Sequence, residues 1–115
     1  RVEFDAVIVI KNKNDVELNL ISNGADLTDG KNILMDVPEK HTGITHLALR
    51  VTDIKAAIDG LAANDITITQ GPVTFGKDGH VSVFIRDPDR NVIELRGRMQ
   101  DEDSIEGLEF YDPEG

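Results

Sequence analysis

The sequence contains no cysteine and no tryptophan, and aromatic residues make up only 4% of its 115 residues. Without cysteine there is neither a disulfide framework nor a thiolate metal site, and we expect a cytoplasmic protein. No run of 18 apolar residues occurs, so we expect no membrane span, and no secretory signal pattern is visible. Glycine-rich phosphate loops, the nucleophile elbow and the HExxH metal motif are also missing from the sequence.

Basic residues are scarce, and the acidic excess is concentrated at one end. The formal net charge is −10, but residues 101–115 contain seven acidic residues and no Lys or Arg, which leaves −3 for residues 1–100. We expect an acidic, solvated and partly disordered tail over residues 99–115. No basic stripe is present to neutralise phosphates, so nucleic acid is not an expected partner.

The first part of the chain predicts a β-hairpin followed by a long connection. Residues 2–10 form a nearly continuous apolar run typical of a buried strand, and residues 15–21 alternate between apolar and polar. Residues 23–43 have few periodic positions and are interpreted as a linker between modules. The hairpin is therefore assigned to residues 1–22.

The second part, residues 44–98, predicts the order β-α-β-β-β. Asp53 is a good N-cap for an amphipathic helix over 54–63, which Asn64 ends. The other expected elements are strands at 44–51, 66–69, 73–75, 80–86 and 92–96, with turns at 77–79 and 87–91. The fold class is therefore α+β.

The predicted strands place polar residues on the face away from the helix, because side chains alternate along a strand. One imidazole and two carboxylates on that face form a nitrogen and oxygen donor set, which suits Mn, Fe, Co, Ni or Zn. A solvated polar face is the plainer interpretation of the same pattern. The polar or aromatic residues on that face are Asp15, Glu17, Asn19, His46, Arg50, His80, Ser82, Phe84, Arg86, Glu94 and Arg96.

Two segments carry a resemblance to a known family. Gly43-Ile44-Thr45-His46-Leu47-Ala48-Leu49-Arg50-Val51 and Asp87-Pro88-Asp89-Arg90-Asn91-Val92-Ile93-Glu94-Leu95 resemble the vicinal oxygen chelate superfamily. This superfamily includes glyoxalase I, extradiol dioxygenases and the bleomycin resistance proteins. The resemblance is strongest over residues 44–97 and weaker over residues 2–21, where residues 14–18 echo residues 91–95.

The resemblance implies paired βαβββ modules that form a curved mixed sheet around a groove. It implies a homodimer and a divalent metal (Ni, Zn, Co, Mn or Fe) held by His46, Glu94 and Glu17. The opening elements of the first module are not in the sequence, which begins at Arg1. Either the sequence is a piece of a longer chain or a partner chain completes the site.

The function implied by the resemblance is a glyoxalase I-like lyase or isomerase that acts on a small oxygen-chelating substrate through an enediolate. Either Glu17 or Glu94 would be the base, and the predicted substrate groove contains Arg50, His80, Phe84, Arg86 and Arg96. One alternative is a drug-sequestering protein without a metal, like the bleomycin resistance members. Another is an iron-dependent dioxygenase.

Two positions depart from the family pattern. Arg90 occupies a turn position where the family usually has glycine, so we expect a strained or reshaped turn there. Phe84 stands where some dioxygenases carry tyrosine, which puts that reaction in doubt.

Overall fold

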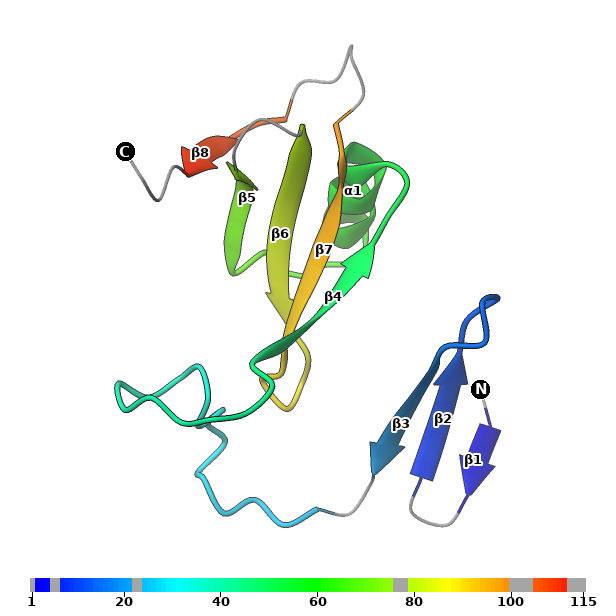
Figure 1. Cartoon of the computed structure of the whole chain (residues 1–115), viewed down its shortest axis with the longest axis vertical. Helices are drawn as coiled ribbons and strands as arrows, with labels where there is room; N and C mark the ends of the chain where they lie inside the picture. The colour runs from blue at the N-terminus through cyan, green and yellow to red at the C-terminus, as the bar shows by residue number, and fades with distance from the viewer. Residues whose placement is uncertain (1, 5–6, 22–23, 76–78, 100–104, 112–115) are drawn as a thin grey trace.

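The computed structural model describes residues 2–4, 7–21, 24–75, 79–99 and 105–111, which form two sheets and a helix (Figure 1). The smaller sheet has the order β1-β2-β3, and the larger one has the order β4-β7-β6-β5-β8. The elements are β1 (Val2–Phe4), β2 (Val7–Lys11), β3 (Glu17–Ile21), β4 (His46–Arg50), α1 (Ile54–Ala63), β5 (Gln70–Phe75), β6 (His80–Arg86), β7 (Val92–Arg98) and β8 (Glu109–Tyr111).

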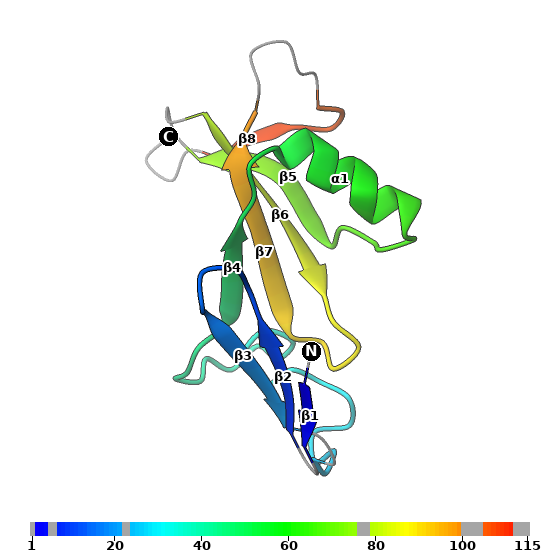
Figure 2. The ribbon, with the colours of Figure 1, turned by 90° about the vertical axis from the view of Figure 1, so that its right-hand side faces the viewer.

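The larger sheet and α1 form the βαβββ module that the sequence predicts. The β4 strand pairs parallel with β7, whereas β6 pairs antiparallel with both β7 and β5. The helix covers one face of this sheet (Figure 2). Its Ile54 and Leu61 pack with Val81 and Val83 of β6 in the buried core, so the opposite face is left for the site.

The helix boundaries follow from local hydrogen bonding at its two ends. The Asp53 carboxylate accepts a hydrogen bond from the backbone N–H of Ala56 at 3.1 Å, as an N-cap residue does. At the other end the backbone N–H of Asn64 donates to the carbonyl of Gly60, and its side-chain amide also donates to that carbonyl. Both predicted helix ends are confirmed.

The connection from β4 to α1 passes against β7 at a glycine. The backbone N–H of Val51 donates to the carbonyl of Arg96 at 2.8 Å. A Cβ atom at Gly97 would lie 2.6 Å from the carbonyl oxygen of Val51, so a larger residue would force the two strands apart. Gly97 therefore lets the parallel pairing of β4 with β7 continue to the end of β4.

The segment between α1 and β6 differs from the prediction. Residues 66–69 are not a strand, and one strand, β5, runs from Gln70 to Phe75 with a register shift between Gln70 and Val73. The predicted strands at 66–69 and 73–75 left Gly71-Pro72 between them, but the chain absorbs this pair as an irregularity within β5. Of the predicted turn at 77–79, residues 77 and 78 lie outside the described residues.

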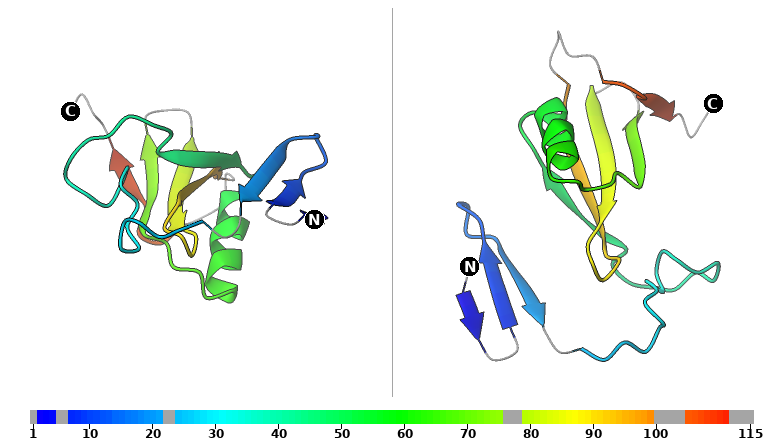
Figure 3. Two further views of the ribbon diagram at one scale, coloured as in Figure 1. Left: turned by 90° about the horizontal axis from the view of Figure 1, so that it is seen from below. Right: turned by 180° about the vertical axis from the view of Figure 1, so that it is seen from behind.

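The N-terminal sheet also differs from the prediction, which had one buried strand over residues 2–10. The structure has two strands there, β1 and β2, and they pair antiparallel with Val2 opposite Val9. The predicted hairpin is confirmed, because β2 pairs with β3 and the Asn12 side chain accepts hydrogen bonds from two backbone N–H groups of the turn. Figure 3 shows this sheet beside the module, to which the linker connects it.

The acidic tail contains an ordered strand that the sequence analysis did not predict. The β8 strand pairs parallel with β5 and becomes the edge of the larger sheet. Ile105 and Leu108, which precede it, are half-buried against the core. Residues 105–111 are therefore part of the fold rather than a solvated end. Separately, no helix among the described residues is long and apolar enough to cross a membrane.

Candidate metal-binding site

Two neighbouring parallel strands bring His46 and Glu94 together. In the register of β4 with β7, Ala48 lies opposite Glu94 and His46 lies opposite Val92, so both side chains project from the same face. His46 Nε2 lies 3.0 Å from Glu94 Oε1. The His46 side chain is 34% exposed and the Glu94 side chain 12% exposed, so the imidazole is the more accessible partner of the pair.

The Glu94 carboxylate is fixed by a second contact on its other oxygen. Ser82, on β6, is completely buried, and its Oγ donates a hydrogen bond to Glu94 Oε2 at 2.7 Å. Short hydrogen bonds from a hydroxyl to a carboxylate are among the stronger ones in proteins. Because Ser82 holds Oε2, it is Oε1 that faces the imidazole.

The second ring nitrogen of His46 contacts Thr45, and the tautomer of the imidazole decides which ring nitrogen donates. His46 Nδ1 lies 3.0 Å from Thr45 Oγ1, which can either donate or accept a hydrogen bond. If Nδ1 carries the proton, the lone pair of Nε2 points at the Glu94 carboxylate. Two electron-rich atoms 3.0 Å apart then require a cation between them, either a proton or a metal ion.

The pair fits two positions in the coordination shell of a small divalent ion. An imidazole nitrogen and a carboxylate oxygen each bind such an ion at about 2.1 Å, so two ligands at a right angle lie about 3.0 Å apart. The observed separation is 3.0 Å. Within the residues that the structure describes, no group of three or more His, Cys, Asp or Glu side chains comes together to hold a metal ion.

Glu17, the third predicted ligand, is not brought to this pair. It lies at the start of β3, paired with Lys11 of β2. A cavity of about 220 Å³ beside His46 is lined by Leu18 and Leu20 of the same strand. Because side chains alternate along a strand, Glu17 projects from the other face.

A second cavity beside His46, of about 230 Å³, contains two of the predicted groove residues, Phe84 and Arg86. The rings of His46 and Phe84 meet edge to face with centroids 5.9 Å apart. Arg50, Arg96 and His80 lie on the same sheet face but toward the other end of the strands. The rest of the lining is Met35, Thr45, Thr69, Gln70 and Val92.

The linker contributes to this cavity through an ion-pair cluster that the sequence analysis missed. Asp36 accepts two hydrogen bonds from the Arg90 guanidinium, at 2.7 and 3.0 Å, and forms an ion pair with Arg86 at 3.0 Å. The Arg90 hydrogen bonds, followed by the backbone N–H of Asn32, hold the pKa of Asp36 well below its ordinary value of 3.8. Asp36 in turn raises the pKa of Arg90.

Arg90 is also the residue that departs from the family pattern in the turn after β6. Its φ of 65° lies in the left-handed region, where glycine is normally preferred. The turn is closed by the Asp87 carboxylate, which accepts hydrogen bonds from the backbone N–H groups of Asp89 and Asn91. The expected strain at residue 90 is therefore present, and the contact with Asp36 offsets it.

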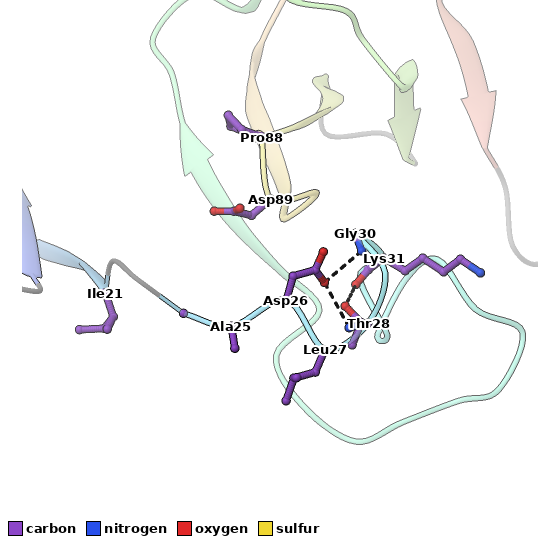
Figure 4. A pocket seen from close by; sticks show the side chains of 10 residues that line it. Ile21, Ala25, Asp26, Leu27, Thr28, Gly30, Lys31, Pro88 and Asp89 are labelled. Carbon is purple, nitrogen blue, oxygen red and sulfur yellow. Dashed lines mark hydrogen bonds between the residues drawn. The ribbon is translucent and has the colours of Figure 1, made fainter.

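A larger cavity, of about 570 Å³, lies between the linker and the turn after β6 (Figure 4). The Asp26 carboxylate on its wall accepts hydrogen bonds from the backbone N–H groups of Thr28 and Gly30, which lower the pKa of Asp26. Those bonds serve the local turn of the linker. None of the residues lining this cavity belongs to the His46–Glu94 pair, so its size does not make it the reactive site.

The family follows from a comparison with known proteins. The family model of the Glyoxalase/Bleomycin resistance protein/Dioxygenase superfamily matches residues 5–95. The chain belongs to this superfamily. The matched span includes β4 to β7 as far as Leu95, so it contains Glu17, His46 and Glu94, and the resemblance described above is confirmed.

Solved structures show the same fold at low sequence identity. A glyoxalase/dioxygenase from Nostoc punctiforme is 23% identical with a TM-score of 0.60, and the match covers 83% of this chain and 62% of that one. A protein from the mobile metagenome of V. Pseudocholerae is 24% identical with a TM-score of 0.56, covering 86% and 74%. A putative glyoxalase from Bacillus halodurans is 19% identical with a TM-score of 0.55, covering 84% and 72%.

This chain spans less than two thirds of the length of the Nostoc protein. No curated protein matches it. The family model and the shared fold establish the superfamily and the fold of this chain.

Proposed function

We propose that this superfamily member is a metal-dependent, glyoxalase I-like lyase or isomerase acting on a small oxygen-chelating substrate. The observation that carries the proposal is the His46–Glu94 pair, with donors 3.0 Å apart on adjacent strands. A groove that only binds a ligand does not require a histidine 3.0 Å from a carboxylate that a buried serine hydroxyl holds in place. The N and O donors suit Zn, Ni, Co, Mn or Fe.

His46 and Glu94 would hold the divalent ion, and Glu17 is the proposed third protein ligand. A bound ion would polarise two adjacent substrate oxygens and so acidify the neighbouring C–H. A carboxylate of the protein then removes the proton α to the carbonyl and returns it to the adjacent carbon.

The contacts of Glu94 favour a ligand role for it. One of its oxygens accepts from Ser82 and the other faces His46, so the carboxylate is oriented on both sides. A base has to approach and leave the substrate carbon, which a doubly held carboxylate does poorly. In this scheme Glu94 acts as a fixed ligand, and Glu17 is the candidate base once the two sheets, in one chain or between chains, come together.

Metal content and metal affinity test the proposal directly. The dialysed protein is analysed for bound metal together with its native mass, and divalent affinity is then measured for His46→Ala and Glu94→Ala. We expect each change to weaken binding at least about 100-fold while the circular dichroism spectrum stays the same, because both residues lie on the face away from the core. The matched control is His41→Ala, which removes an exposed linker histidine.

Each alternative function predicts a different result. Parent-like affinity in either variant would rule out this site. A protein that takes up no metal even after reloading would support the drug-sequestering interpretation. Stoichiometric iron with oxygen uptake would support a dioxygenase.

A further inference from the structure

The cavity of about 230 Å³ beside His46 has a wall that does not come from the sheet. Met35, in the linker, lines it together with Phe84 and Val92 from β6 and β7. Met35 lies next to Asp36, and Asp36 is bound to Arg86 and Arg90. The linker is thus fastened across the end of the sheet where His46 lies.

This fastening is built from several interactions that converge on one carboxylate. The Asp36 side chain is only 12% exposed and the Arg86 side chain 17% exposed, so the contact is shielded. The Asn32 side-chain amide also donates to the carbonyl of Arg90 at 3.1 Å, which ties the linker to the turn at a second point. We call residues 32–36 with Arg86 and Arg90 the linker clasp.

We propose that the linker clasp forms the outer wall of a substrate subsite beside His46, and that Met35 selects ligands carrying a small, uncharged, apolar group. The proposal deepens the proposed function, because it describes the part of the ligand that lies away from the reacting oxygens. The wall itself does not depend on a metal ion.

The lining explains why the accepted group is uncharged and apolar. Met35, Phe84 and Val92 contribute apolar surface. The hydroxyl of Thr69 donates to the carbonyl of Phe84, and that of Thr45 is in contact with His46. Nη1 of the Arg86 guanidinium already contacts Asp36 and donates to the carbonyl of Arg90, so it is engaged within the clasp.

The volume limits the size of this group. A cavity of about 150 Å³ admits a benzene molecule, whereas pockets for drug-sized ligands have about 300–1,000 Å³. A cavity of about 230 Å³ therefore accommodates a ring or a short branched chain beside two oxygens.

Two hydroxamates allow the contribution of the apolar group to binding to be measured apart from that of the two oxygens. Acetohydroxamate and benzohydroxamate present the same pair of adjacent oxygens, but only the second carries a ring. The chain has two methionines, Met35 and Met99, so labelling with methyl-13C methionine gives two signals, which a Met35→Leu variant assigns. Met99 packs against the core and serves as an internal control.

We expect benzohydroxamate to shift the Met35 methyl signal and leave Met99 in place, in the purified protein and in the zinc-loaded protein. Its binding should be about tenfold tighter than that of acetohydroxamate, because the ring is partly removed from water. Met35→Ala should remove most of this preference, because it should weaken benzohydroxamate binding much more than acetohydroxamate binding.

Asp36→Asn tests the clasp separately from Met35. We expect it to reduce the ring preference about as much as Met35→Ala, because the wall loses its anchor while the methionine is retained. Asp26→Asn is the matched control: it removes one charge from the same linker, and Asp26 lines the other cavity.

The outcomes distinguish this proposal from the proposed function. A Met35 signal that benzohydroxamate leaves unmoved in both forms of the protein would overturn the subsite, even if zinc binds at His46. Equal affinities for the two hydroxamates would also overturn it. If the Met35 shift persists in a His46→Ala variant that no longer binds zinc, the subsite stands independently of the metal.

Discussion

The two sheets of this protein are built from similar sequence patterns and have different degrees of burial. In the module, Val81 and Val83 of β6 are at most 1% exposed beneath α1. In the N-terminal sheet, Leu18 and Leu20 of β3 are 42% and 41% exposed, although they alternate with polar residues just as cleanly. Alternation thus identifies a strand with one apolar face, but only a covering element converts that face into a core.

The same difference applies to the candidate metal ligands. His46 and Glu94 are held by pairing within one sheet, so a single βαβββ unit brings them together. Glu17 belongs to the other sheet, and no element of that sheet packs against an element of the module among the described residues. A three-residue metal centre therefore requires the two sheets, in one chain or between chains, to come together.

The largest effect is expected in the core of the module. Ile54→Ala removes a completely buried side chain, and we expect it to lower the free energy of unfolding by about 2–5 kcal/mol. Leu20→Ala, in the exposed sheet, should cost less than about 1 kcal/mol. Urea unfolding monitored by circular dichroism measures both. Equal losses would show that β3 is covered in solution.

Glu17→Gln tests whether the two regions share one metal centre. We expect divalent metal affinity to fall about tenfold or more, because a neutral amide is a poorer ligand than a carboxylate. Titrations at several protein concentrations would reveal whether a second copy supplies the contact. Glu106→Gln, an exposed change in the tail, is the control. Unchanged affinity would mean that the metal ligands come from the module alone.

Ser82→Ala tests the orientation of Glu94 within the module. We expect metal affinity to fall about tenfold, because the carboxylate loses the hydrogen bond that fixes Oε2. Thr74→Val removes a hydroxyl that donates to the carbonyl of His80 on the adjacent strand and leaves Glu94 untouched. If both variants lost affinity equally, the effect of Ser82 would come from general stability rather than from orientation.

The smallest effect is a pH dependence of the linker clasp. The pKa of Asp36 is lower in the folded protein than its ordinary value of 3.8, so the unfolded state binds more protons between the two values. The stability contributed by Asp36 is therefore complete from about pH 5 upward and declines as the pH falls below that. The difference in unfolding free energy between the parent and Asp36→Asn should be largest at pH 5–6 and shrink toward pH 3. A constant difference would mean that the carboxylate does not act through its charge.

Local interactions explain which parts of the fold were predictable. Asp53 and Asn64 mark the ends of α1 because the hydrogen bonds they make are local. The strand at 73–75 was predicted, but the start of β5 at residues 70–72 was missed because Gly71-Pro72 looks like a terminator in sequence, while pairing with β6 carries the strand through it. The β8 strand was missed because its pairing with β5 spans a long sequence separation and its acidic residues favour solvent.

For the site, the sequence identified the residue types and the tertiary structure decided which of them meet. The residues His46, Phe84 and Glu94 share a face because alternation along a strand is fixed by backbone geometry, so the sequence alone determined it. That Ser82 holds Glu94, that Asp36 fastens the linker, and that Met35 lines the cavity are long-range outcomes. No local pattern records them, because they depend on strand register and on where the linker crosses the sheet.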